Sequence, residues 1–106
     1  MTFLCHKDTI AEPGSLGIDK HGLFIVRQNG RCFAYRNRCP HLGVELNWTE
    51  NQFLDRDDSL IQCATHGALF VVETGECVAG PCLGDCLEAV PIIEHNGELH
   101  LAEDQT

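Results

Sequence analysis

Runs of β-forming hydrophobic residues lie on both sides of two Asn-Gly pairs in this chain of 106 residues. The first pair, Asn29-Gly30, lies inside GLFIVRQNGRCFAYRN, and the second, Asn96-Gly97, lies inside VPIIEHNGELHLA. Asn and Gly tolerate the positive φ angles of a type I′ turn, the usual two-residue link between antiparallel strands. Each segment therefore predicts a β-hairpin, and the period of two in the second segment predicts a half-buried sheet.

Three shorter β-forming runs lie between the two hairpins, at about 59–62, 68–72 and 76–78. Turn-forming residues separate these runs, and no stretch shows a sustained helical period. The pattern predicts an all-β fold of small antiparallel sheets. The length suits one domain over residues 1–106.

The composition excludes several classes of protein. No apolar run is long enough to cross a membrane, and the N-terminal residues do not resemble a signal peptide, so we expect a cytoplasmic, reducing location. The net charge of −9 argues against a nucleic-acid partner and against docking on an anionic membrane. The acidity fits either simple solubility or an acidic face that steers a basic redox partner.

Two short boxes combine a cysteine with a histidine. Cys39 and His41 lie in CPHLG, and Cys63 and His66 lie in CATHGALF. Two thiolates and two imidazoles suit either tetrahedral zinc or a two-iron cluster with split ligation. Zinc modules usually pair like ligands within one loop, whereas each box here supplies one of each kind. The spacing therefore favours the iron cluster, with structural zinc as the alternative.

The two boxes closely resemble those of the Rieske [2Fe–2S] proteins. Gly67 follows the second histidine as in that family, and Gly80-Pro81 resembles the family's Pro-containing loop that covers the cluster. The likeness extends roughly from Leu16 to Leu101. It implies a Rieske-like fold, in which small antiparallel sheets carry a two-loop cluster-binding subdomain, and one [2Fe–2S] cluster per chain.

The resemblance also implies a role for each ligand. Cys39 and Cys63 would bind the buried iron, and His41 and His66 would bind the outer iron near solvent. Neutral imidazoles in place of two thiolates lower the cost of adding an electron. Rieske clusters accordingly have potentials of about −150 to +300 mV, against about −400 mV for plant-type ferredoxins.

The chain departs from the high-potential Rieske proteins of respiratory complexes. Those proteins have a disulfide between the cluster loops, and a Ser and a Tyr that donate hydrogen bonds to cluster sulfurs. Here Val44 and Thr65 occupy the positions of the disulfide cysteines, while Ala68 and Phe70 replace the Ser and the Tyr. Fewer donors to sulfur stabilise the reduced cluster less, so we predict a potential near the bottom of the range.

The expected function is that of a soluble ferredoxin, which passes single electrons from a flavin reductase to a terminal oxygenase. The protein would be an electron-transfer component rather than an enzyme, with no catalytic residue of its own. Alternatives are a small subunit of a nitrite reductase, a redox-sensing interaction module and the Rieske domain of an oxygenase. The last is disfavoured because 106 residues leave no room for a catalytic domain.

The gap between His41 and Cys63 holds 21 residues, more than many oxygenase-type ferredoxins need. A longer surface loop costs little free energy, and its aromatic residues Trp48 and Phe53 would then belong to the core. The alternative is a partner-docking loop that presents both aromatic side chains. We favour the first interpretation.

The five other cysteines have no histidine at box spacing. Cys5 and Cys32 fall in predicted strands and should pack as small buried hydrophobic residues. Cys77, Cys82 and Cys86 lie within CVAGPCLGDC, where they are either ordinary thiols, a second metal site or a redox-active Cys82/Cys86 pair. Cys82 also lies close in sequence to the Gly80-Pro81 segment that is predicted to cover the cluster. Its S–H group could therefore tune the cluster site.

The remaining histidines are assigned no function. They are His6, His21, His95 and His100, and the pattern predicts that His95 and His100 are exposed.

Overall fold

The computed structural model describes residues 2–40, 43–47, 50–65 and 67–102, and this part of the chain is almost entirely β. The strands are β1 (Thr2–His6), β2 (Gly14–Ile18), β3 (Leu23–Gln28), β4 (Arg31–Arg36), β5 (Leu60–Gln62), β6 (Leu69–Val71), β7 (Cys77–Ala79), β8 (Ile92–His95) and β9 (Glu98–Leu101). Two short 3₁₀ turns, η1 (Lys7–Thr9) and η2 (Asp19–His21), complete the fold. The all-β prediction is confirmed.

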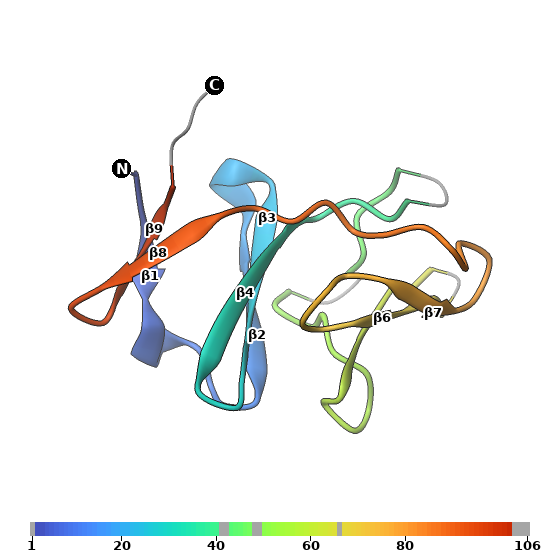
Figure 1. The fold of residues 1–106 in the computed structure, drawn as a ribbon, viewed down its shortest axis with the longest axis horizontal. Helices are drawn as coiled ribbons and strands as arrows, with labels where there is room; N and C mark the ends of the chain where they lie inside the picture. Colours follow the sequence, from blue (N-terminus) through green and yellow to red (C-terminus); the bar gives the residue numbers. More distant parts are fainter. Residues whose placement is uncertain (1, 41–42, 48–49, 66, 103–106) are drawn as a thin grey trace.

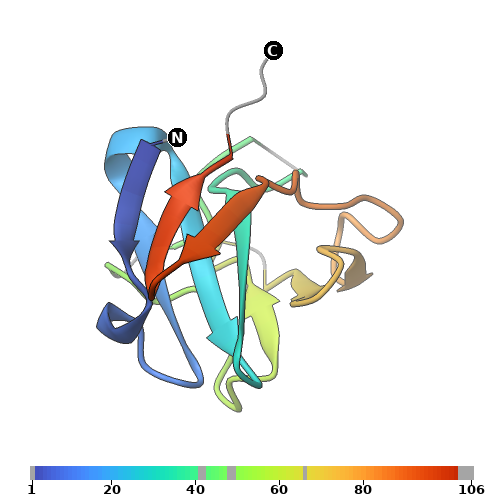
Figure 2. The same ribbon diagram turned by 60° about the vertical axis from the view of Figure 1, so that its left-hand side comes forward.

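The strands form three antiparallel sheets of three strands each. We call them the base sheet (order β1-β9-β8), the central sheet (β2-β3-β4) and the small sheet (β5-β6-β7). The central sheet lies between the other two along the long axis of the molecule (Figures 1 and 2).

Both predicted hairpins are confirmed. Gln28 pairs with Arg31 across Asn29-Gly30, and the same register recurs in the β8–β9 hairpin across Asn96-Gly97. All four turn residues have positive φ angles, from 54° to 79°. The three shorter runs are also strands, β5 to β7. No bound of these strands differs from its predicted position by more than one residue.

Strand β3 separates two hydrophobic cores. Successive side chains of a strand point to opposite faces, so Leu23 and Ile25 face one core while Phe24 and Val26 face the other. The base core consists of Cys5, Ile10, Leu23, Ile25, Ala34, Val90 and Leu99. The small-sheet core consists of Phe24, Val26, Tyr35, Cys39, Leu46, Phe53, Ile61, Cys63, Ala68, Phe70, Val72, Cys77, Cys82 and Leu87. Both faces of β3 are buried, which explains why its run LFIV shows no polar alternation.

The long segment before β5 is anchored to strand β2. The Ser15 hydroxyl donates a hydrogen bond to the Asn51 carbonyl (2.7 Å), and the Gly17 amide donates to Asn51 Oδ1 (2.8 Å). The Phe53 ring is fully buried and stacks on the Phe24 ring at 4.3 Å between centroids. Phe53 is therefore a core residue and not a docking residue, whereas Trp48 lies outside the described residues.

Cys5 is buried in the base core as predicted, whereas Cys32 is only half-buried against that core. His95 is exposed, but the prediction for His100 is wrong. Its ring is half-buried edge-on to Phe3, at 5.7 Å between ring centroids. None of the described helices is long and apolar enough to cross a membrane.

Candidate metal centre

The first predicted ligand loop is a tight turn that directly follows strand β4. The Cys39 amide donates to the Val44 carbonyl, and the Gly43 amide donates to the Cys39 carbonyl, both at 2.7 Å. Gly43 has a φ angle of +73°, which a residue without a Cβ adopts at little cost. Asn37 fixes the end of the turn, because its Oδ1 accepts a hydrogen bond from the Leu46 amide (2.8 Å). The Cys39 side chain is thereby held in the interior, at 1% exposure.

The second predicted ligand loop repeats this geometry between β5 and β6. The Cys63 amide donates to the Ala68 carbonyl (2.9 Å), and the Gly67 amide donates to the Cys63 carbonyl (2.8 Å). Gly67 has a φ angle of +71°, close to that of Gly43. Cys63 is fully buried. Each turn thus presents a buried thiol at the same position of the same backbone arrangement.

The two turns are also joined to each other. The Ala64 amide, next to Cys63, donates a hydrogen bond of 2.7 Å to the Leu46 carbonyl at the end of the first turn. Cys39 and Cys63 both belong to the small-sheet core. The structure therefore brings the two predicted thiolate ligands into one region, although 23 positions of the sequence separate them.

The two predicted imidazole ligands, His41 and His66, lie outside the described residues. Within the ranges that the structure describes, no group of three or more His, Cys, Asp or Glu side chains is arranged to hold a metal ion. In sequence, each histidine falls between the cysteine and the glycine that close its turn. The assignment of both histidines stays a prediction.

The Gly80-Pro81 segment packs against the second turn, as the resemblance implied. Gly80 has a φ angle of +103°, and a Cβ atom added there would lie 2.7 Å from the Ala68 Cα atom. Such a separation is far below van der Waals contact, so only glycine lets the two backbones approach this closely. The segment that follows β7 therefore covers the turn that carries Cys63.

Two buried thiols, those of Cys77 and Cys82, flank the Gly80-Pro81 segment in the small-sheet core. Cys82 Sγ donates to Cys77 Sγ at 3.1 Å, and Cys77 Sγ donates to the Ala79 carbonyl at 3.2 Å. Burial raises the pKa of the Cys82 thiol to about 12, with further contributions from its contacts with Cys77 and then with Cys39. Cys86, in contrast, is exposed. The hydrogen-bonded neighbour of Cys82 is therefore Cys77. The Cys82/Cys86 pair, one of the alternatives from the sequence, is not formed in this structure.

The residues present fit an iron–sulfur cluster. Two buried thiols in matched, mutually bonded turns supply the soft anionic ligands that iron prefers. The neighbouring Ala68 and Phe70 side chains are fully buried and carry no polar atom. They contribute no hydrogen-bond donor to a cluster sulfur.

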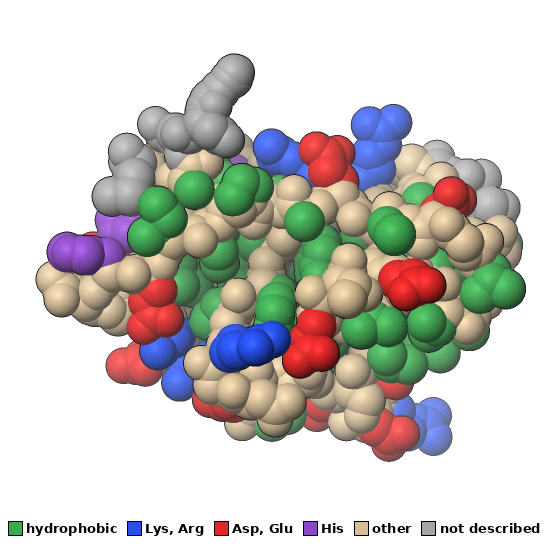
Figure 3. All heavy atoms as spheres, in the orientation of Figure 1, with side chains coloured by type: hydrophobic (Ala, Val, Ile, Leu, Met, Phe, Trp, Pro, Cys, Tyr) green, Lys and Arg blue, Asp and Glu red, His purple; other side chains and the backbone are tan. Residues whose placement is uncertain are grey.

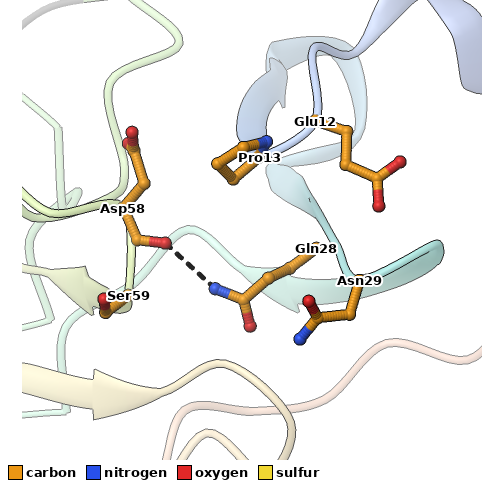
Figure 4. Close-up of a pocket in the computed structure, with 6 residues that line it drawn as sticks. All are labelled: Glu12, Pro13, Gln28, Asn29, Asp58 and Ser59. Carbon is orange, nitrogen blue, oxygen red and sulfur yellow. Dashed lines mark hydrogen bonds between the residues drawn. The ribbon is translucent and has the colours of Figure 1, made fainter.

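One of the surface hollows in the described part of the chain lies away from the two turns, and another borders the first turn. One, of about 420 Å³, lies where the β3–β4 turn meets the segment before β5, and Gln28 Nε2 donates to the Asp58 carbonyl (3.0 Å) across it (Figure 4). It is lined by Glu12, Pro13, Gln28, Asn29, Asp58 and Ser59. The other, of about 370 Å³, adjoins the first turn and is lined by Arg36, Arg38, Cys39, Pro40, Gly43, Cys86 and Glu88. The first hollow lacks a thiol or an imidazole, so we do not regard it as part of the metal centre.

Comparisons with known proteins identify the family of this chain. The Rieske [2Fe-2S] domain family matches residues 1–94. The cholesterol 7-desaturase of Caenorhabditis elegans is 31% identical over 81 residues, which are 74% of this chain but 18% of that protein. The 3-phenylpropionate/cinnamic acid dioxygenase ferredoxin subunit of Photorhabdus laumondii is 22% identical over 100 residues, or 93% of this chain and 90% of that subunit.

Solved structures share the fold. The ferredoxin of Sphingomonas yanoikuyae B1 has a TM-score of 0.76 at 21% identity and covers 96% of this chain and 97% of its own. The terminal oxygenase of carbazole 1,9a-dioxygenase from Nocardioides aromaticivorans IC177 has a TM-score of 0.75 at 16% identity, over 98% of this chain and 30% of the oxygenase. The family's domain holds one [2Fe–2S] cluster, which the two matched turns fit. This chain belongs to the Rieske [2Fe–2S] domain family.

Proposed function

We propose that this protein is a ferredoxin that carries single electrons from a flavin reductase to a terminal oxygenase. The observation that carries the proposal is the pair of matched turns, which bury the Cys39 and Cys63 thiols in one core. Cys39, His41, Cys63 and His66 would hold the [2Fe–2S] cluster, which supplies reversible one-electron chemistry. The protein would position the cluster, bury it and provide the surface on which the partner proteins dock.

The relatives support a separate carrier. The ferredoxin subunit of a dioxygenase matches over 90% of its own length. One of the similar solved structures is a complex of reduced oxygenase and oxidized ferredoxin in carbazole 1,9a-dioxygenase, in which the fold of this chain recurs with a TM-score of 0.74. An oxygenase partner is therefore the acceptor that we propose, with the cytoplasm as the location.

Exposed apolar side chains near the turns suit a transient partner. Val44 closes the first turn and is 38% exposed, and Leu83, two residues after Pro81, is 68% exposed. Small apolar contacts of this kind support the weak association typical of electron-transfer partners. On the face drawn in Figure 3, acidic side chains are dispersed among hydrophobic and basic ones instead of forming one acidic patch.

We also propose a low potential, in the lower part of the range of about −150 to +300 mV. The apolar Ala68 and Phe70 side chains support it, because they leave cluster sulfurs without two hydrogen-bond donors found in high-potential members. A voltammetric midpoint well above zero would contradict this part of the proposal.

The ligand assignment is tested by substitution. We expect Cys39→Ser and His66→Ala to abolish the native absorption and EPR spectra of the cluster, whereas Cys5→Ser, in the base core, should retain them. Retention of the native spectrum in either ligand variant would refute the assignment. A colourless protein that contains zinc would refute the cluster itself.

The carrier function is tested with separate proteins. The purified protein should accept electrons from a flavin-dependent reductase and pass them to an oxygenase or to cytochrome c. The rate should exceed that of transfer from the reductase to the same acceptor without this protein. A cluster-loaded protein that no reductase reduces would instead favour a redox-sensing module.

The Rieske domain of a larger oxygenase is a second candidate. It is favoured by the terminal oxygenase that shares the fold over 98% of this chain. In that case the electron acceptor would be a catalytic domain joined to this one, and transfer to a separate oxygenase would be slow.

A further inference from the structure

The thiol of Cys82 lies between two other sulfur atoms in the small-sheet core. Its Sγ is 3.1 Å from Cys77 Sγ, and its side chain also contacts that of Cys39. Cys39, Cys77 and Cys82 are each no more than 2% exposed. Water therefore does not compete for the hydrogen bonds among these three sulfurs.

The direction of these hydrogen bonds follows from counting protons. Cys77 donates its S–H to the Ala79 carbonyl at 3.2 Å, so its sulfur is left as an acceptor. Cys39, as an iron ligand, is a thiolate and has no proton to give. Cys82 is thus the one of these three residues whose proton can point to either neighbour. A charged acceptor binds a donor about twice as strongly as a neutral one.

We propose that Cys82 donates its S–H to the sulfur of Cys39 and thereby raises the reduction potential of the cluster. Cys77, which accepts the Cys82 S–H at 3.1 Å in this structure, is then the competing acceptor. This inference rests on the proposed role of Cys39 as an iron ligand. A donor to a ligand sulfur would stabilise the reduced cluster more than the oxidised one, since reduction adds one negative charge to the cluster.

The backbone around Cys82 is built to hold this position. The Asp85 amide donates to the Cys82 carbonyl (2.8 Å), and the Leu83 amide donates to the Gly80 carbonyl (3.3 Å). Gly80 in turn lies against Ala68. Cys82 therefore restores a donor at a site where Ala68 and Phe70 supply none.

The decisive variant is Cys82→Ala. We expect the cluster to assemble with a lower midpoint potential, equivalent to a threefold to tenfold change in the equilibrium constant for reduction. Tenfold corresponds to about 59 mV for a one-electron couple. The matched control is Cys5→Ala, which removes a buried thiol from the base core and should leave the potential unchanged. The EPR g values should move in Cys82→Ala and not in the control.

Two further variants separate donation from packing. Cys82→Ser keeps a donor and should have a potential at or above that of the wild type. Cys77→Ala removes the competing acceptor and should not lower the potential. An unchanged potential in Cys82→Ala, or a Cys82→Ser potential as low as that of Cys82→Ala, would overturn the proposal.

The outcomes remain distinguishable if a variant fails. Should Cys82→Ala not assemble the cluster, the Cys82→Ser potential decides alone, since a value below the wild type overturns donation. A failure of the ligand assignment looks different, because Cys39→Ser would then retain the native cluster spectrum.

Discussion

The two cores on either side of strand β3 are built in different ways. The base core lies between sheets whose strands have four to six residues, and its buried members are hydrocarbon side chains and one cysteine. The small-sheet core rests on strands of three residues and buries four cysteines, including both predicted thiolate ligands. Short strands form few cross-strand hydrogen bonds, so we infer that the small-sheet core depends on its cofactor for stability while the base core does not.

The largest expected effect comes from removing the cluster, by a chelator under reducing conditions or by Cys39→Ser. Amide protection from hydrogen exchange in β5, β6 and β7 should fall at least about 100-fold, or roughly 2.7 kcal/mol of opening free energy. Protection in β3, β8 and β9 should persist. Equal loss in all three sheets would show that the two cores unfold as one unit.

Truncation of one side chain in each core should separate their roles. Phe70→Ala and Leu99→Ala both remove fully buried side chains and should cost about 3–5 and 2–5 kcal/mol in the free energy of unfolding. Phe70→Ala should also speed the release of iron during denaturant unfolding, because Phe70 lies in the small-sheet core. If Leu99→Ala released iron equally fast, the contrast between the cores would be wrong.

Two glycines with positive φ angles offer a matched pair. Gly97→Ala, in the β8–β9 turn, has open space for a Cβ atom and should cost about 1–2 kcal/mol for the backbone conformation alone. Gly80→Ala adds overlap with the Ala68 backbone and should cost about 2–4 kcal/mol. Thermal unfolding measures both costs. Only Gly80→Ala should alter the absorption and EPR spectra of the cluster. Equal costs would mean that the covering segment moves away freely.

The smallest effect concerns a hydrogen bond within the small-sheet core. The buried Tyr35 hydroxyl donates to the Val72 carbonyl at 2.7 Å, so Tyr35→Phe should cost about 0.5–1.5 kcal/mol at neutral pH. Burial raises the pKa of Tyr35 above its usual value of 10. The neutral phenol is favoured in the folded state, so its contribution is complete below pH 10 and declines as the pH rises further. The stability difference between wild type and Tyr35→Phe, measured by urea unfolding, should therefore shrink in alkali.

The fold was predictable where local chemistry decides it. Asn29-Gly30 and Asn96-Gly97 specify their hairpins by themselves, because both residues accept positive φ angles. Strand β2 was not predictable, since its sequence GSLGI has low β propensity. Its hydrogen bonds to the segment before β5 involve Asn51 and Phe53, which lie 34 to 38 residues away in the sequence. No local pattern predicts these contacts.

The site was predictable to a similar degree. The two Cys-His boxes predicted two ligand loops, and the structure shows that the Cys39 and Cys63 thiols are buried in one core. The Cys82 contact with Cys77 was missed, because it depends on how the chain bends after β7. The sequence offered a Cys82/Cys86 pair as one alternative, but Cys86 is exposed and Cys82 bonds to Cys77 instead.

The pairing of β1 with β9 determines how this domain connects to whatever adjoins it. Thr2 lies opposite Leu101, so the backbone enters and leaves side by side at the base sheet, away from the small sheet and its turns (Figure 1). A linker, an affinity tag or an electrode anchor joined at either strand would leave the electron-exchange end uncovered. The same fold recurs over 97% of the chain of one solved ferredoxin and over 30% of a much longer terminal oxygenase chain.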